Sequence, residues 1–125
     1  MSENELSKIV FNCALKVHQA LGPGLLESTY KDYLFNELKK LGLEIEKQVT
    51  LPLAPSKSHI TTDYQPDIII ENKLILEIKA IDVLNEAHFE PMLTYLKLTN
   101  CKLGLLINFN VTLIKKGIKK IVNNF

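Results

Sequence analysis

Three charged side chains stand within two neighbouring segments that are otherwise apolar. Asp67 directly precedes the run Ile68–Ile70, and Glu77 and Lys79 lie in the next apolar run. A charge buried in such a segment costs several kcal/mol unless it is paired or binds a metal ion. These residue types therefore predict either a set of ion pairs or a site that binds a cation.

The spacing of these charges decides whether they can meet. Glu77 and Lys79 are two residues apart, so they share one face of a strand. If residues 71–73 form a three-residue hairpin loop, Asp67 lies opposite Glu77, whereas a two-residue loop places the carboxylates on opposite faces. Opposed β-carbons lie about 5 Å apart, which lets two carboxylates share one divalent cation. A cation site therefore requires a loop with an odd number of residues.

The chemistry of this acid pair favours a hard metal ion. Two close carboxylates repel each other unless a proton or a cation lies between them. Their oxygen ligands suit Mg²⁺ or Mn²⁺ rather than zinc. Lys79 beside the pair could orient or deprotonate a water, or stabilise charge on a phosphate. The alternative is a structural ion pair of Lys79 with Asp67 or Glu77, and the spacing alone leaves both interpretations open.

Two motifs give these residues a family resemblance. Pro66 and Asp67, followed after nine residues by Glu77, Ile78 and Lys79, resemble the PD-(D/E)xK signature of the restriction-endonuclease-like nuclease superfamily. Residues 24–30 read GxxExxY, the stretch VHQALGP precedes them, and LGLLINFN follows near the C-terminus. Together they resemble the GxxExxY protein family, a branch of that superfamily, over about residues 5–122. The resemblance implies an α-β-β-β-α-β core and metal-dependent hydrolysis of DNA or RNA phosphodiester bonds.

The resemblance also implies a role for individual residues. Asp67, Glu77 and the carbonyl of Ile78 would hold the Mg²⁺ or Mn²⁺ ion, and Glu27 would complete the site. Lys79 would be the catalytic lysine, while the metal ion would activate water and offset charge in the transition state. Read without the resemblance, Glu27 is an acid in the first turn of a helix, where the helix dipole favours it.

Four further residues are accessory candidates: His18, Tyr30, Glu90 and Tyr95. Tyr95 follows Pro91 by four residues, and relatives tend to have glutamine at the position of Pro91. Because proline donates no hydrogen bond, a substrate or water contact there is lost unless Glu90 replaces it. His18 and Tyr30 have a structural interpretation as well, as a hydrogen-bonded histidine within a helix and as a core aromatic residue.

The elements that must position these residues follow from apolar periodicity. It predicts helices over residues 5–21, 26–41 and 86–99, and strands over 43–53, 60–70, 73–81 and 101–109. The tail 113–122 fits a short helix or an edge strand. We therefore expect one α/β domain over residues 1–125, with a mixed sheet of about four strands flanked by helices.

Composition excludes several classes of protein. With 46% hydrophobic and 23% charged residues, the chain is neither disordered nor a membrane-spanning protein, since no apolar run approaches ~18 residues. The first ten residues lack the apolar region of a signal peptide. Cys13 and Cys101 are far apart and match no disulfide or metal spacing, which favours buried thiols in a reducing, cytoplasmic compartment.

The number and type of charged residues indicate how the chain could bind nucleic acid. The net charge is +1 and all 15 basic residues are lysine. Bidentate recognition of guanine edges, which favours arginine, is therefore poorly supplied, whereas lysine can still bind phosphates. The lysine cluster 115–120 could meet a phosphate backbone or form a solvated face. We expect DNA or RNA as the substrate, with specificity from a homodimer or a partner protein. The rival function is a non-catalytic module that keeps the fold to bind nucleic acid or protein.

Overall fold

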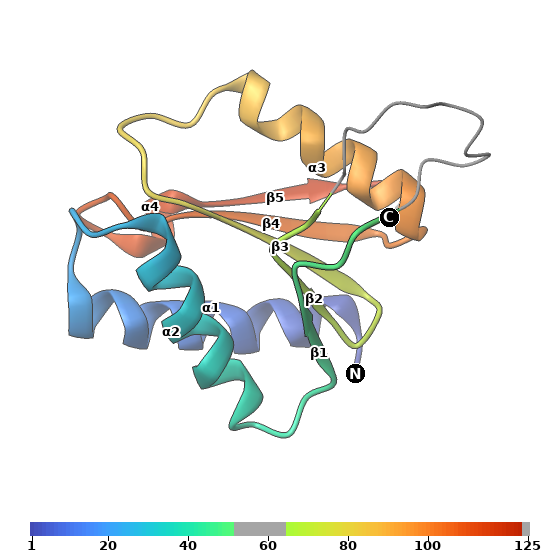
Figure 1. The fold of residues 1–125 in the computed structure, drawn as a ribbon, viewed down its shortest axis with the longest axis horizontal. Coiled ribbons are helices and arrows are strands. Elements are labelled where there is room, and N and C mark those ends of the chain that lie inside the picture. Colours follow the sequence, from blue (N-terminus) through green and yellow to red (C-terminus); the bar gives the residue numbers. More distant parts are fainter. Residues whose placement is uncertain (52–64, 124–125) are drawn as a thin grey trace.

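A five-stranded mixed sheet separates two layers of helices, with α3 on one face and α1 and α2 on the other (Figure 1). The computed structural model describes residues 1–51 and 65–123. In chain order the elements are α1 (Glu3–Leu21), α2 (Glu27–Lys39), β1 (Ile45–Lys47), β2 (Ile68–Ile70), β3 (Leu74–Lys79), α3 (Glu86–Thr99), β4 (Leu103–Asn108), α4 (Ile114–Gly117) and β5 (Ile118–Val122). This arrangement confirms the predicted α/β class.

The strands lie in the sheet in chain order, from β1 to β5. Only β3 and β4 are parallel, because α3 carries the chain back between them, and every other neighbouring pair is antiparallel. The expected α-β-β-β-α-β order is present. The sheet has five strands rather than about four because the tail adds β5 to its edge.

The first two helices begin and end where the sequence provides signals. At the start of α1, Ser2 Oγ accepts from Glu5 N at 3.1 Å and Glu5 Oε1 accepts from Ser2 N at 3.0 Å, which makes a capping box. The helix ends at Gly22, whose φ of 67° is easily adopted by glycine. The predicted helices over 5–21 and 26–41 are confirmed, with bounds two residues away at most. Among the described residues, no helix is long and apolar enough to cross a membrane.

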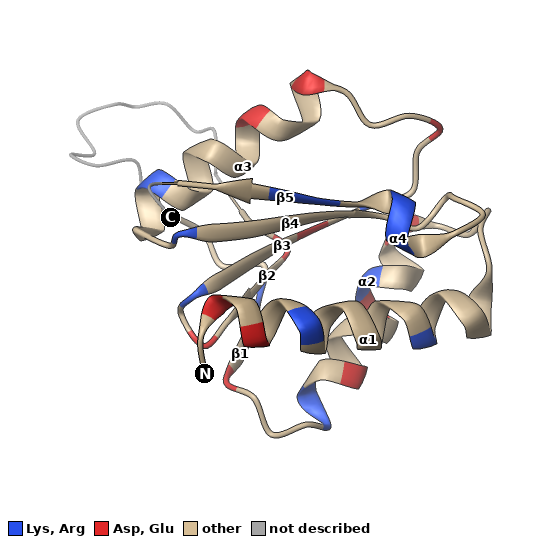
Figure 2. Cartoon of the chain, turned by 180° about the vertical axis from the view of Figure 1, so that it is seen from behind, with Lys and Arg blue, Asp and Glu red and all other residues tan. Residues whose placement is uncertain are grey.

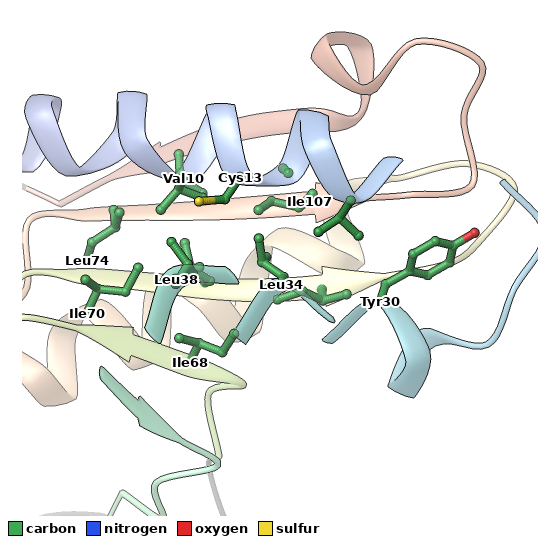
Figure 3. Close-up of a cluster of buried hydrophobic side chains, with 14 of the residues drawn as sticks. Val10, Cys13, Tyr30, Leu34, Leu38, Ile68, Ile70, Leu74 and Ile107 are labelled. Carbon is green, nitrogen blue, oxygen red and sulfur yellow. The ribbon is translucent and has the colours of Figure 1, made fainter. Parts of the chain in front are cut away.

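The sheet is covered on both faces, and the cover explains the unbroken Ile and Leu runs of its central strands. On one face, Leu74, Leu76 and Ile78 of β3 pack in the larger core with α1 and α2 (Figure 3). On the other face, Ile75 packs with α3 in a smaller core. Successive side chains of a strand point to opposite faces, so Glu77 and Lys79 share the α3 face with Ile75. Cys13 and Cys101 are buried, free thiols, as expected.

The β2–β3 hairpin has the loop that the cation site requires. Ile70 pairs with Leu74, which leaves a three-residue loop, residues 71–73. Glu71 and Asn72 adopt φ of 53° and 54°, and Lys73 N donates to Ile70 O at 2.9 Å. The predicted odd-numbered loop is therefore confirmed, and the register places Asp67 next to Glu77.

Two predicted strands are shorter than the sequence pattern indicates. In the segment 43–53, β1 ends at Lys47 because Gln48 turns the chain with φ of 53°; residues 52 and 53 lie outside the described residues. In the segment 60–70, only Ile68–Ile70 pairs as a strand, and residues 60–64 lie outside the described residues. Predicted strands over 73–81 and 101–109 are confirmed as the slightly shorter β3 and β4.

Helix α3 occupies the predicted residues 86–99. Asn85 Oδ1 accepts from Ala87 N, and His88 Nδ1 accepts from Asn85 N, so the helix begins at its cap and Pro91 lies inside it. The first buried residue of α3 is Met92. The tail, for which the sequence allowed either a short helix or an edge strand, forms both in succession, as α4 and β5.

Candidate active site

The predicted acid pair lies where regular pairing between β2 and β3 stops. The last backbone pair is Ile68 with Leu76. Beyond it, Asp67 N donates to Glu77 Oε1 at 2.8 Å, and Ile78 N donates to Asp67 Oδ2 at 2.8 Å. Each carboxylate thus accepts a hydrogen bond from the backbone of the opposite strand. The hairpin brings together the two side chains that the spacing had placed face to face.

A cation from α2 completes this arrangement, although the sequence motifs did not point to it. Lys31 Nζ lies 2.8 Å from Asp67 Oδ1, and the two side chains are only 14% and 12% exposed. Burial alone would lower the pKa of Lys31, but the hydrogen bond and charge of Asp67, with the charges of Glu27 and Glu77, raise it. Three acids therefore act on one ammonium group. The available signal was the spacing of Lys31, four residues after Glu27 and so on the same helix face.

Glu77 is strongly perturbed. Its burial and the nearby charge of Asp67 raise its pKa to about 8, against the lowering effects of the Asp67 N–H, Lys79 and Lys31. The side chain is buried at 7% exposure. At neutral pH the metal-free protein therefore holds a proton on this carboxyl group, as expected for two carboxylates that share one small space.

The end of β3 is held in place by a second residue to which the sequence motifs did not point. Asn108, which pairs with Lys79 across β3 and β4, is 2% exposed. Its Oδ1 accepts from Ile81 N at 3.1 Å and its Nδ2 donates to Ile81 O at 2.9 Å. Phe109 N donates to Lys79 O at 2.9 Å. A polar residue at the end of the apolar run LGLLI was the signal that could have identified it.

The donor set of this site fits a hard divalent cation. Asp67 and Glu77 are buried oxygen donors, and burial together with the charge of Asp67 raises the pKa of Glu77, so a bound cation would favour the ionised carboxylate. Glu27 is the first residue of α2, and its charge reaches Lys31. Over residues 1–51 and 65–123, however, no three His, Cys, Asp or Glu side chains gather closely enough to hold an ion. A third carboxylate ligand therefore stays a prediction.

Two accessory candidates make contacts at the corner between α1 and α2. Tyr30 is fully buried, and its hydroxyl donates to Gly22 O at 2.5 Å and accepts from Leu25 N at 3.1 Å. Its ring stacks on Phe109 at 4.7 Å between centroids. His18 Nε2 donates to Val111 O at 2.8 Å. These contacts tie the corner to the segment after β4, next to the end of the strand that holds Lys79 in register.

The other two accessory candidates lie on α3. Tyr95 is 8% exposed and packs in the smaller core with Ile69 and Ile75. Glu90 and Pro91 are exposed, one turn before Tyr95. Glu90 as a replacement for the missing glutamine therefore stays a prediction, and so does any accessory role of Tyr95.

The chain matches one family model, that of the PD-(D/E)XK nuclease superfamily, over residues 4–121. Comparison with curated proteins gave no significant match, and comparison with solved structures gave none either. The matched residues span both layers of helices, all of the sheet except the last residue of β5, and Asp67, Glu77 and Lys79. With this extent of match and this arrangement of the signature residues, the chain belongs to the PD-(D/E)XK nuclease superfamily.

Proposed function

We propose that the protein is a divalent-metal-dependent nuclease that hydrolyses phosphodiester bonds of DNA or RNA, and that it belongs to the GxxExxY branch of its superfamily. The observation that carries the proposal is the pair of hydrogen bonds across the β2–β3 hairpin, in which the Glu77 carboxylate accepts from Asp67 N and the Asp67 carboxylate accepts from Ile78 N. Lys79 lies at the end of β3, the strand that holds Glu77. Nucleases of this superfamily generally use divalent metals, and the donor oxygens here suit Mg²⁺ or Mn²⁺.

Each residue of the site has a stated task in this proposal. Asp67, Glu77 and the Ile78 carbonyl would hold the ion, with Glu27 as a further acid, and the chemistry supplied there would be activation of a water and neutralisation of phosphate charge. Glu77 gives up the proton that it holds in the metal-free protein, because only the carboxylate is a good ligand. Lys79 Nζ orients the water or binds the developing charge on the phosphate.

The distribution of charge supports a polyanionic substrate. Residues 91–125 contain six lysines and no aspartate or glutamate, although the net charge of the whole chain is only +1. Figure 2 shows lysines on α4 and β5. Lys119 pairs with Leu106, which pairs with Glu77, so Lys119 lies in the same row of the sheet as the acid. A phosphate backbone that leaves the site toward β5 meets these lysines.

A non-catalytic binding module is the second candidate, and the ion pair of Lys31 with Asp67 favours it. An acid that is neutralised within the chain is less available to a metal ion. Pro91 at the position where relatives tend to have glutamine points the same way. In this alternative the lysines still bind nucleic acid, but no bond is broken.

Cleavage assays separate the two candidates. Labelled single- and double-stranded DNA and RNA are incubated with Mg²⁺ or Mn²⁺ and wild type, Glu77→Ala or Lys79→Ala. The matched controls are Glu46→Ala and Lys47→Ala, which change the same residue types at exposed positions of β1. The nuclease proposal expects cleavage by wild type and both controls and none by the two site variants. Equal cleavage by all five proteins indicates a contaminant, and no cleavage by any protein favours the binding module.

We extend the proposal to the cellular compartment of the protein and to its assembly with other chains. The buried thiols of Cys13 and Cys101 suit a reducing, cytoplasmic compartment. A homodimer or a partner protein would supply the sequence or structure specificity that a chain without arginine lacks. Light scattering of the protein with and without a duplex measures the number of chains in the complex.

A further inference from the structure

The backbone hydrogen bonds at the acid pair leave one oxygen of the Asp67 carboxylate for a cation from the protein itself. Asp67 Oδ2 accepts from Ile78 N, and Glu77 Oε1 accepts from Asp67 N, so backbone groups satisfy these two oxygens. Asp67 Oδ1 instead contacts Lys31 Nζ at 2.8 Å. The lysine thus neutralises the carboxylate at the oxygen that the backbone does not satisfy.

The structure fixes Lys31 more firmly than the other paired lysines. Of the three ion pairs among residues 1–51 and 65–123, the lysine side chain is 14% exposed for Lys31, 34% for Lys47 and 74% for Lys40. Lys31 follows the fully buried Tyr30 and precedes the fully buried Leu34, so the core holds its stretch of α2 against the sheet. A pair with this burial affects affinity and stability far more than an exposed pair does.

We propose that Lys31 is an internal counter-cation of the acid pair, and that its ammonium group competes with the divalent metal ion for Asp67. The inference rests on the proposed function, because it concerns the metal that this function requires. An ammonium group and a divalent ion repel each other strongly at contact distance in a partly buried site, so both cannot hold Asp67 at full strength. Metal binding therefore releases Lys31 from Asp67, and Lys31 lowers the affinity of the site for the ion.

The first test measures metal affinity without any substrate. Mn²⁺ is titrated calorimetrically into wild type, Lys31→Met and Lys31→Arg, because methionine keeps a similar chain length without charge and arginine keeps the charge. Lys47→Met is the control, since Lys47 has an ion pair of its own with Asp32 at 2.7 Å, on the exposed side of α2. We expect Lys31→Met to bind Mn²⁺ about tenfold more tightly than wild type, as for a coupling of ordinary size between two competing ligands. Lys31→Arg and Lys47→Met should show no such gain.

The second test uses wild-type protein, so it stands even if Lys31→Met fails to fold. Lysines are acylated briefly with and without saturating Mn²⁺, and the modification of each residue is measured by mass spectrometry. A released Lys31 becomes accessible, so its modification should rise severalfold with Mn²⁺ while that of Lys47 stays constant. Modification of Lys31 that is unchanged or lower with bound Mn²⁺ overturns the inference.

The outcomes separate this inference from the nuclease proposal. Equal or weaker Mn²⁺ binding by Lys31→Met, with wild type still cleaving nucleic acid, overturns the role of Lys31 and leaves the nuclease proposal in place. Mn²⁺ binding by Lys31→Met but not by wild type supports the competition and contradicts metal-dependent cleavage by the natural chain. If neither protein binds Mn²⁺, both proposals are wrong.

Discussion

Beyond the last backbone pair of β2 and β3, the carboxylates of Asp67 and Glu77 take over the hydrogen bonding between the two chain segments. At each of these residues a carboxylate takes the hydrogen bond that a backbone carbonyl would otherwise take from the opposite strand. The hairpin therefore forms two buried acids without leaving the local N–H groups unpaired. Ionising both acids is unfavourable, because burial and the charge of Asp67 raise the pKa of Glu77.

The raised pKa of Glu77 predicts how metal-free stability depends on pH. The pKa is about 8 in the folded protein against an ordinary value of 4.5, so the folded state binds the proton more tightly. Its contribution is then fully present below about pH 4.5 and is lost as pH rises through about 8. Urea unfolding in EDTA should show stability falling across this window for wild type. Glu77→Gln should remove the fall, whereas Glu46→Gln, at an exposed position, should keep it; a flat wild-type profile contradicts the prediction.

The residues of the site differ in how far the sequence could reveal them. The contact of Asp67 with Glu77 was predictable because it depends on spacing within one hairpin, where parity decides which side chains meet, and parity also places Lys79 on the face of Glu77. Lys31 and Asn108 were not predictable, because their contacts depend on which face of α2 meets the sheet and on where β4 ends beside β3. Those are tertiary facts that local periodicity does not contain.

At the scale of elements, the parity of the β2–β3 loop is the feature that the site requires. Deleting Asn72 leaves two loop residues, and the register then sends Asp67 to the face opposite Glu77. We expect this deletion to abolish the rise in melting temperature that Mn²⁺ produces in wild type. Asn72→Gly keeps three residues and suits the φ of 54°, so it should keep the Mn²⁺ effect. A deletion variant that folds and still responds to Mn²⁺ would falsify the parity argument.

Helices were predicted better than strands, and the reason is physical. The periodicity and caps of α1 and α3 lie within each helix, so their bounds could be found locally. A strand exists only where a partner pairs with it. β1 ends before Gln48 although apolar residues follow it, and β2 begins only after Asp67. The tail also becomes a strand only through its partner, because β5 pairs with the edge of β4.

Gly117 joins α4 to β5 and allows this edge to close. A Cβ at this position would overlap the carbonyl oxygen of Asn108, which is a backbone atom and not the end of a flexible side chain. We expect Gly117→Ala to reduce the free energy of unfolding by about 1–3 kcal/mol, the usual cost of overpacking. Urea denaturation measures the loss, and Lys116→Ala is the control because its side chain is exposed. If the two variants have equal stability, the close contact does not constrain the fold.

At the scale of the whole molecule, charge is separated along the chain although the net value is small. All 14 acids lie in residues 1–90, and the C-terminal part, which contains β4, α4 and β5, has lysines alone. Over the described residues, Lys115, Lys116 and Lys119 form no ion pair, whereas Lys31, Lys40 and Lys47 each do. Unpaired lysines gain most from a phosphate partner, because no internal contact has to be broken first.

This separation predicts where nucleic acid binds and how salt affects the binding. In the non-cleaving Glu77→Gln background, changing Lys115, Lys116 and Lys119 to Gln should weaken binding of a DNA duplex. It should also reduce the slope of log affinity against log salt by about 3, close to one per phosphate contact. The control changes Lys16, Lys39 and Lys40 to Gln, which removes the same charge from a separate cleft between α1 and α2. Fluorescence anisotropy at several salt concentrations measures both slopes.

Equal losses in the two triple variants mean that only net charge matters, and a loss in the control alone moves the substrate path to the α1–α2 side. A loss confined to the first triple variant places the phosphate backbone along α4 and β5, in line with the row of the sheet that runs from Lys119 to Glu77.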